Sequence, residues 1–145
     1  NKAYEAALEV YEPLYPLLKH KPESLFEVAQ CLSKTGRYEK ANGYLERAVL
    51  LSSDPMLYYV MAKNEQCLGE YRQAEKHLLH AIDILPERIY PYYLLMNLYT
   101  EPSYFQPAKL KMAIDSVLTK KPKVESSAIK EMKEKARSML NNTSI

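Results

Sequence analysis

The sequence predicts an all-α protein made of antiparallel helix pairs, and two observations lead to this prediction. The first is an internal repeat with a period of 33 residues, at which eight positions recur. Leu25, Val28, Ala29, Gly36, Tyr38, Ala41, Leu45 and Ala48 are matched at that spacing by Tyr58, Met61, Ala62, Gly69, Tyr71, Ala74, Leu78 and Ala81. The second is the spacing of three and four residues between apolar positions within each copy, which is typical of a helix with one buried stripe.

The first copy of the repeat predicts two helices joined by a glycine turn. Residues 23–34 carry one apolar stripe, made of Leu25, Val28, Ala29 and Leu32. Gly36 can adopt the left-handed conformation that ends a helix. A second helix over about 38–51 turns Tyr38, Ala41, Leu45 and Ala48 inward. The alanines of both copies should be buried where two helices meet, because a small side chain lets two backbones approach closely.

The second and third copies predict two further pairs. Helices over about 56–68 and 72–85 flank Gly69, and Pro86 ends the second of them. The third copy begins at Ile89 and buries Tyr92, Leu95, Met96 and Tyr99. Its turn, residues 101–107, is longer than the glycine turns. Pro107 can then start a helix over 107–119 that buries Leu110, Ile114 and Val117.

The two ends differ from the internal copies, as terminal repeats usually do. Residues 2–19 predict an unpaired second helix with Ala7, Tyr11 and Leu14 inward, kinked or shortened by Pro13 and Pro16. Residues 124–140 predict a charged helix that covers the last pair with Ile129, Met132, Ala136 and Met139. We therefore expect a single domain over 1–145: a partial helix in 1–21, repeats in 22–54, 55–88 and 89–122, and a capping helix and tail in 123–145.

Composition excludes several classes of protein. The net charge is +2, and no apolar run reaches the length that spans a bilayer, so no direct membrane insertion is expected. The lysines of the tail alternate with glutamates and have no aromatic residues between them, which favours a solvated helix face over a nucleic-acid contact. The chain begins at Asn1, without a signal-like segment, and we expect a fragment or a processed product.

The repeat resembles the tetratricopeptide repeat over roughly residues 22–122. The first copy matches the family's pattern at Leu25, Val28-Ala29, Leu32, Gly36-Arg37-Tyr38, Ala41, Leu45 and Ala48, and the second also carries the closing Pro86. Ser53 stands where the first copy would carry that proline, and Glu65 where the second would carry an aromatic residue. The resemblance implies a superhelix of antiparallel helix pairs with a concave groove, and a non-catalytic scaffold that binds a protein or peptide.

A second, narrower resemblance is to the soluble C-terminal repeat region of bacterial O-antigen ligase or polymerase-like membrane proteins. It rests on three segments, residues 30–36, 85–95 and 118–126. It implies the alternative that this chain is a structural or regulatory periplasmic tail of a membrane glycan enzyme, whose groove is filled by the membrane domain of the same chain. The chain would then be periplasmic, and otherwise cytoplasmic.

Groove-facing positions follow from the family's geometry. Carried onto this chain, they are Phe26, Gln30, Met56, Tyr59, Lys63, Tyr90, Tyr93 and Asn97. The aromatic line Phe26, Tyr59 and Tyr93 should be partly exposed and could grip a peptide, because rigid rings give a large contact area at low entropic cost. An aromatic that is simply common in the repeat and half-covered by its neighbours explains the line equally well.

Other chemistries are not indicated by the residues. The family's clamp for a C-terminal carboxylate needs Lys and Asn where this chain has Phe26 and Gln30. His77 and His80 could share a metal, but neither cysteine has a ligand spacing to them, and both histidines are expected on the outer, exposed part of their helix. We expect Cys31 and Cys67 to be free thiols in helices. No catalytic residue, metal or cofactor is predicted.

Overall fold

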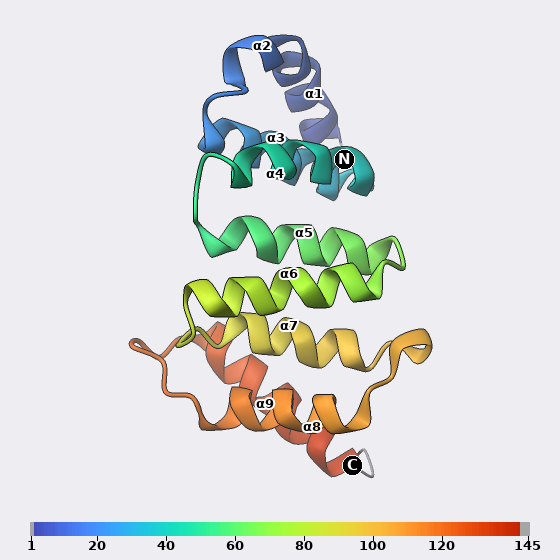
Figure 1. The fold of residues 1–145 in the computed structure, drawn as a ribbon, viewed down its shortest axis with the longest axis vertical. Coiled ribbons are helices and arrows are strands. Elements are labelled where there is room, and N and C mark those ends of the chain that lie inside the picture. The colour runs from blue at the N-terminus through green and yellow to red at the C-terminus, as the bar shows by residue number, and fades with distance from the viewer. Residues whose placement is uncertain (1, 143–145) are drawn as a thin grey trace. The chain divides into compact units, whose positions relative to one another are not determined.

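The computed structural model describes residues 2–142 and shows an all-α protein of antiparallel helices (Figure 1). The elements are α1 Lys2–Tyr11, η1 Glu12–Leu14, α2 Tyr15–Leu18, α3 Pro22–Lys34, α4 Tyr38–Val49, α5 Pro55–Cys67, α6 Tyr71–Ile84, α7 Tyr90–Tyr99, η2 Pro102–Tyr104, α8 Pro107–Thr119 and α9 Ser127–Asn142. The last residues of the predicted tail, 143–145, lie outside the described residues. Packing divides the chain into an N-terminal unit, residues 1–77, and a C-terminal unit, residues 78–145.

Helix ends follow the local chemistry that the sequence carries. Gly36 and Gly69 have positive φ angles of 80° and 77°, which confirms their predicted left-handed conformation. Before Gly36, the Thr35 hydroxyl donates hydrogen bonds to the carbonyl oxygens of Cys31 and Leu32, both at 3.0 Å. Helix α5 begins with Pro55 in its first turn, and the Asp54 carboxylate accepts a hydrogen bond from the Met56 amide at 3.0 Å.

The core of the N-terminal unit is formed by the stripes that the repeat predicts. Helix α3 contacts α4, and α4 contacts α5 (Figure 1). The buried side chains of this core are Leu8, Leu25, Val28, Ala29, Leu32, Ala41, Leu45, Ala48, Leu57 and Met61. The alanines Ala41, Ala48, Ala74 and Ala81 are all at most 1% exposed, which confirms their predicted burial.

The N-terminal segment differs from its prediction. It is α1, a single 3-10 turn and the short α2, because Pro13 and Pro16 interrupt the helical hydrogen bonding. The inward residue of α1 is Leu8, which is buried, while Ala7 and Tyr11 are half-buried. The expectation for Leu14 was wrong: it is 39% exposed, since the 3-10 turn rotates it out of the stripe of α1.

A buried amide pair joins α4 to α5. Asn64 Nδ2 donates to Asn42 Oδ1 at 2.8 Å, and Asn42 Nδ2 donates to the Met61 carbonyl oxygen at 3.3 Å. Both asparagines are at most 7% exposed. Since a buried amide without partners is costly, this pair fixes the axial position of α5 against α4.

The C-terminal unit packs α7 against α8, and α9 contacts both (Figure 1). Leu110, Ile114 and Val117 of α8 are fully buried, as predicted. Of the predicted stripe of α9 only Ala136 is buried, and the other three residues are half-buried. The reason is that α9 contacts helices on one side only, so its longer side chains lie at the edge of the contact.

A lysine of α9 attaches this helix to the end of α8. Lys133 Nζ donates to the carbonyl oxygens of Val117 at 2.9 Å, Leu118 at 3.2 Å and Lys120 at 3.0 Å. These carbonyls lie where an α-helix ends, so the ammonium group pairs with the negative end of the helix dipole.

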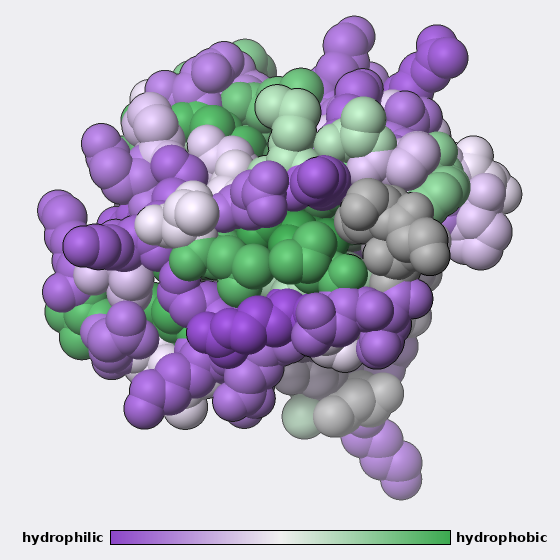
Figure 2. Space-filling view, turned by 90° about the horizontal axis from the view of Figure 1, so that it is seen from below, coloured by the Kyte–Doolittle hydropathy of each residue, from purple (hydrophilic) through white to green (hydrophobic). Residues whose placement is uncertain are grey.

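On the face nearest α8 and α9, apolar side chains form a band between rows of hydrophilic ones (Figure 2).

Candidate functional site

The predicted groove residues of the N-terminal unit lie on α3 and α5. Gln30, Met56 and Lys63 are exposed, and Phe26 is half-buried. Gln30 and Lys63 occupy the same position in successive copies of the repeat, and α3 contacts α5. These four residues, Phe26, Gln30, Met56 and Lys63, are called the α3–α5 surface below.

Tyr59 does not belong to this surface, and its predicted exposure was wrong. The residue is only 5% exposed. Helix α5 buries Leu57, Tyr59, Met61, Ala62, Asn64 and Glu65, which extend around most of its circumference. The arc of α5 left open is therefore narrower than the family's geometry implies, and it holds Met56 and Lys63.

The predicted groove residues of the C-terminal unit lie on α7. Tyr90, Tyr93 and Asn97 are half-buried, and the rings of Tyr90 and Tyr93 stack with centroids 6.4 Å apart. Lys135 Nζ of α9 lies 5.5 Å from the centroid of the Tyr93 ring. Part of this aromatic surface is thus already in contact with a cation of the same chain.

Two of the tail lysines have aromatic partners that their sequence neighbours do not supply. Lys120 Nζ lies 4.9 Å from the centroid of the Tyr92 ring, and Lys135 Nζ lies over the Tyr93 ring. Both contacts join α9 and the segment before it to α7. Lys135 nevertheless stays exposed, in agreement with the predicted solvated face.

The tyrosines of the second helices are less buried than expected. Tyr38 and Tyr71 are half-buried rather than fully packed between pairs. A hydrogen bond with Cys67 raises the pKa of Tyr38.

Both cysteines are free thiols in helices, as predicted. The pKa of the Cys31 thiol is raised, mainly by burial and in second place by the negative charge of Glu27.

A pocket of about 500 Å³ opens in the N-terminal unit among α4, α5 and the start of α6. We call it the acidic pocket. Its lining residues are Glu46, Val49, Tyr58, Met61, Glu65, Glu70, Gln73 and His77. Three of them are carboxylates and none is a lysine or arginine, so the pocket has a negative charge.

The innermost charge of the pocket is a buried glutamate paired with a histidine. The Glu65 side chain is 6% exposed, and His77 Nδ1 lies 2.7 Å from Glu65 Oε1. The His77 ring also lies 5.8 Å from the ring of Tyr58. The prediction that both histidines are exposed was therefore wrong for His77, while His80 is exposed. From the sequence alone His77 was expected at the surface, because its partner Glu65 lies twelve positions away on another helix.

In the sequence, Glu65 stands out only as a departure from the repeat. That departure was the available signal, because a charged residue at a position where the repeat carries an aromatic side chain needs a partner once it is buried. His77 lies on α6 at a distance of 12 residues, which no local motif reveals.

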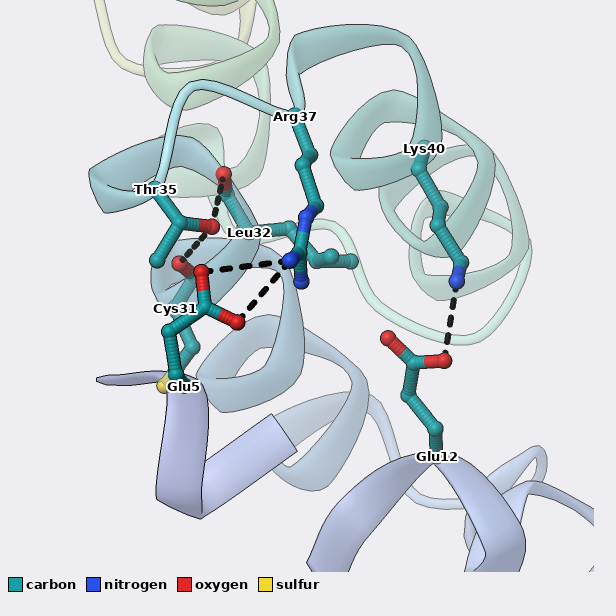
Figure 3. Close-up of polar contacts among 7 residues, drawn as sticks. All are labelled: Glu5, Glu12, Cys31, Leu32, Thr35, Arg37 and Lys40. Atoms are coloured by element: carbon teal, nitrogen blue, oxygen red, sulfur yellow. Dashed lines mark hydrogen bonds and ion pairs between the residues drawn. The ribbon is translucent and has the colours of Figure 1, made fainter. Parts of the chain in front are cut away.

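Two surface ion pairs join α1 and η1 to Arg37, which precedes α4, and to Lys40 of α4 (Figure 3). Arg37 Nη2 lies 2.8 Å from Glu5 Oε2, and Lys40 Nζ lies 2.8 Å from Glu12 Oε2. These side chains are about one third to one half exposed, so each pair contributes little to stability. Neither pair lines the acidic pocket.

Within residues 2–142, no three or more His, Cys, Asp or Glu side chains gather in a way that could hold a metal ion. Nor does any helix in that range combine the length and the apolar character that crossing a bilayer requires.

Comparison with known proteins identifies the repeat. The profile of the family described as "Anaphase-promoting complex, cyclosome, subunit 3" matches residues 1–81. "Tetratricopeptide repeat protein 21A" of Mus musculus is 34% identical over 79 residues, which is 54% of this chain and 6% of that protein. These findings confirm the resemblance to the tetratricopeptide repeat. They give no support to the resemblance to O-antigen ligases or to a periplasmic compartment.

Solved structures agree on the fold. A crystal structure of MamA superposes with a TM-score of 0.74 at 18% identity and covers 97% of this chain and 80% of that one. A structure of MamA from Desulfovibrio magneticus RS-1 gives a TM-score of 0.68 at 17% identity and covers 92% and 68%. At these identities the likeness establishes an all-α fold of antiparallel helix pairs and nothing further.

Proposed function

The chain belongs to the family described as "Anaphase-promoting complex, cyclosome, subunit 3", a tetratricopeptide-repeat family, and from this premise we propose that it is a non-catalytic scaffold that binds proteins. The repeat supplies a stack of helix pairs whose first helices present side chains to an extended partner. The observation that carries the proposal is the α3–α5 surface, where equivalent positions of two copies are exposed side by side.

The composition of this surface suits a peptide backbone with mixed side chains. Gln30 offers a donor and an acceptor, Lys63 a cation, and Phe26 and Met56 apolar contact area. On the C-terminal unit, Tyr90, Tyr93 and Asn97 are proposed as a further contact that α9 partly covers. Tyr59, which is 5% exposed, is left out of the proposed contact residues.

Site-specific photo-crosslinking tests the proposal. A benzoylphenylalanine at Gln30 should form an adduct with a protein partner in an extract of the source cells, because the residue is exposed on the α3–α5 surface. The matched control is the same label at Glu39, an exposed residue of α4. Equal adducts from both labels, or none from Gln30 while Glu39 reacts, would overturn the proposal.

A double variant that reverses the charge of the α3–α5 surface provides a second test. The double variant Gln30→Glu with Lys63→Glu should weaken capture of the crosslinked partner about tenfold without changing the melting temperature, because both side chains are exposed. If the partner is instead the membrane part of a longer version of this chain, the adduct from Gln30 will have the mass of one polypeptide rather than two. Mass spectrometry distinguishes these outcomes.

A further inference from the structure

The acidic pocket is a feature separate from the α3–α5 surface. On α5 the pocket residues Tyr58, Met61 and Glu65 follow a spacing of three and four and therefore share one face. Met56 and Lys63 of the α3–α5 surface fall about half a turn away on the same helix, since successive residues are rotated by about 100°. The two surfaces thus use opposite sides of α5.

Glu65 can accept a further hydrogen bond from within the pocket. His77 Nδ1 is bonded to Glu65 Oε1, and the second oxygen, Oε2, carries lone pairs of its own. The Glu65 side chain is 6% exposed and lines the pocket. A cationic ligand that donates to this carboxylate would make a charge-assisted hydrogen bond, which is stronger than one between neutral groups.

The glutamates of the pocket outnumber its histidine. His77 Nδ1 lies 2.7 Å from Glu65 Oε1, and Gln73 Nε2 lies 3.5 Å from His77 Nε2. Even an imidazolium would offset only one of the three carboxylates, so the pocket keeps a net negative charge. Glu46 and Glu70 add two exposed carboxylates at the rim.

The walls of the pocket suit an aliphatic stem that ends in a cation. Val49 and Met61 supply apolar contact, and Tyr58 supplies an aromatic ring. Lysine and arginine side chains bury their methylene groups along such walls, and their charged ends are attracted to aromatic faces and to carboxylates. A neutral apolar side chain would offer no donor to Glu65.

We propose that the acidic pocket binds a basic side chain, lysine or arginine, of a partner protein. The proposal rests on the proposed function only in taking the partner to be a protein. It adds a contact on the side of α5 opposite the α3–α5 surface, with a defined chemistry: an ammonium or guanidinium group that donates to Glu65, at the end of a stem lying along Met61 and Tyr58.

The test uses small probes and needs no knowledge of the partner. Nα-acetyl-lysine amide and Nα-acetyl-arginine amide should shift the Met61 methyl resonance in a saturable way, with affinities on the order of millimolar for so small a ligand. The Met56 methyl, on the opposite side of α5, should not respond. Nα-acetyl-norleucine amide, which has a similar stem and no charge, should bind at least about tenfold more weakly.

Variants then locate the binding. Glu65→Gln keeps the shape of the side chain and should weaken lysine binding about tenfold, while Glu70→Gln, at the exposed rim, should weaken it about threefold. Glu39→Gln is the matched control on α4 outside the pocket. Should Glu65→Gln fail to fold, as judged by circular dichroism, Glu70→Gln and the norleucine probe still decide.

Three results would overturn the proposal: equal shifts from the norleucine and lysine probes, unchanged lysine affinity in a folded Glu65→Gln variant, or the same affinity in Glu70→Gln as in Glu39→Gln. Absence of the photo-crosslink at Gln30 would leave these measurements unchanged, because none of them uses the partner protein. Failure of the pocket and failure of the α3–α5 surface are therefore told apart.

Discussion

The N-terminal unit buries polar side chains between its helices, whereas the C-terminal unit closes an apolar core with a charged helix. Within the described residues, the buried polar side chains are Asn42, Asn64, Glu65 and Glu75, all in residues 1–77. In the C-terminal unit, α9 brings Lys133 to the end of α8 and Lys135 to Tyr93. The two units thus specify their helix contacts differently: the N-terminal unit by buried hydrogen bonds, and the C-terminal unit by lysines of α9 that bind α7 and α8.

This difference shows which positions can vary between copies of a repeat. The apolar positions are fixed by the need to bury one stripe on each helix. Polar positions next to that stripe are free to differ between copies, and these positions produce the amide pair and the acidic pocket. Four substitutions test the comparison, from the largest expected effect to the smallest.

Ile114→Ala should be the most destabilising of the changes considered, by about 2–5 kcal/mol, because the side chain is fully buried in an apolar core and leaves a cavity. Met112→Ala on the same helix is the control, since Met112 is 70% exposed and its loss should cost less than about 0.5 kcal/mol. Urea unfolding followed by circular dichroism measures both. Similar midpoints for the two variants would contradict the assigned core.

Asn42→Ala should cost about 1–3 kcal/mol, because it leaves the buried Asn64 amide without its acceptor. Asn64→Ala should cost a similar amount. If the amides act as a pair, the double variant will be less destabilised than the sum of the two, with a coupling energy of about 0.5–3 kcal/mol in a double-mutant cycle. Strictly additive costs would show that the pair does not specify the contact.

Lys133→Met should destabilise the C-terminal unit by about 1 kcal/mol, because the last carbonyls of α8 lose their cation. Native-state hydrogen exchange should show faster exchange in α9 than in the parent. Lys130→Met serves as the control: Lys130 is exposed on the same helix, and exchange of α9 should stay as in the parent. Equal exchange rates in the two variants would rule out Lys133 as the attachment.

Arg37→Ala should have the smallest effect, less than about 1 kcal/mol, since its ion pair with Glu5 is exposed (Figure 3). The difference from the parent should shrink further in 1 M salt, where screening weakens surface pairs. Melting curves at low and high salt measure it. A cost as large as that of Asn42→Ala would mean that surface charge, rather than buried hydrogen bonding, defines the N-terminal unit.

The aliphatic and alanine positions of the repeat were predictable, whereas its tyrosines Tyr38 and Tyr71 and the residues that need a partner from another helix were not. The 33-residue period and the helical spacing give Leu25, Leu45 and Ile114 their correct buried positions. Tyr59 was predicted to be partly exposed because the family's groove positions were carried onto this helix, and they do not show that α5 is buried over most of its circumference. The pairing of His77 with Glu65 depends on how α5 and α6 pack, and the spacing of residues along the sequence does not reveal that packing.

The amide pair between α4 and α5 also bears on how a repetitive chain avoids assembling in the wrong order. Copies that share apolar stripes can dock out of sequence during folding, and such misassembly is a characteristic failure of repeat proteins. The position of Asn64 is held by Cys31 one copy earlier, so α3 docked on that face of α4 would leave Asn42 without its amide partner. A wrongly ordered stack would bury an unsatisfied polar group and be disfavoured, and the pair thereby identifies which helix is the neighbour of α4.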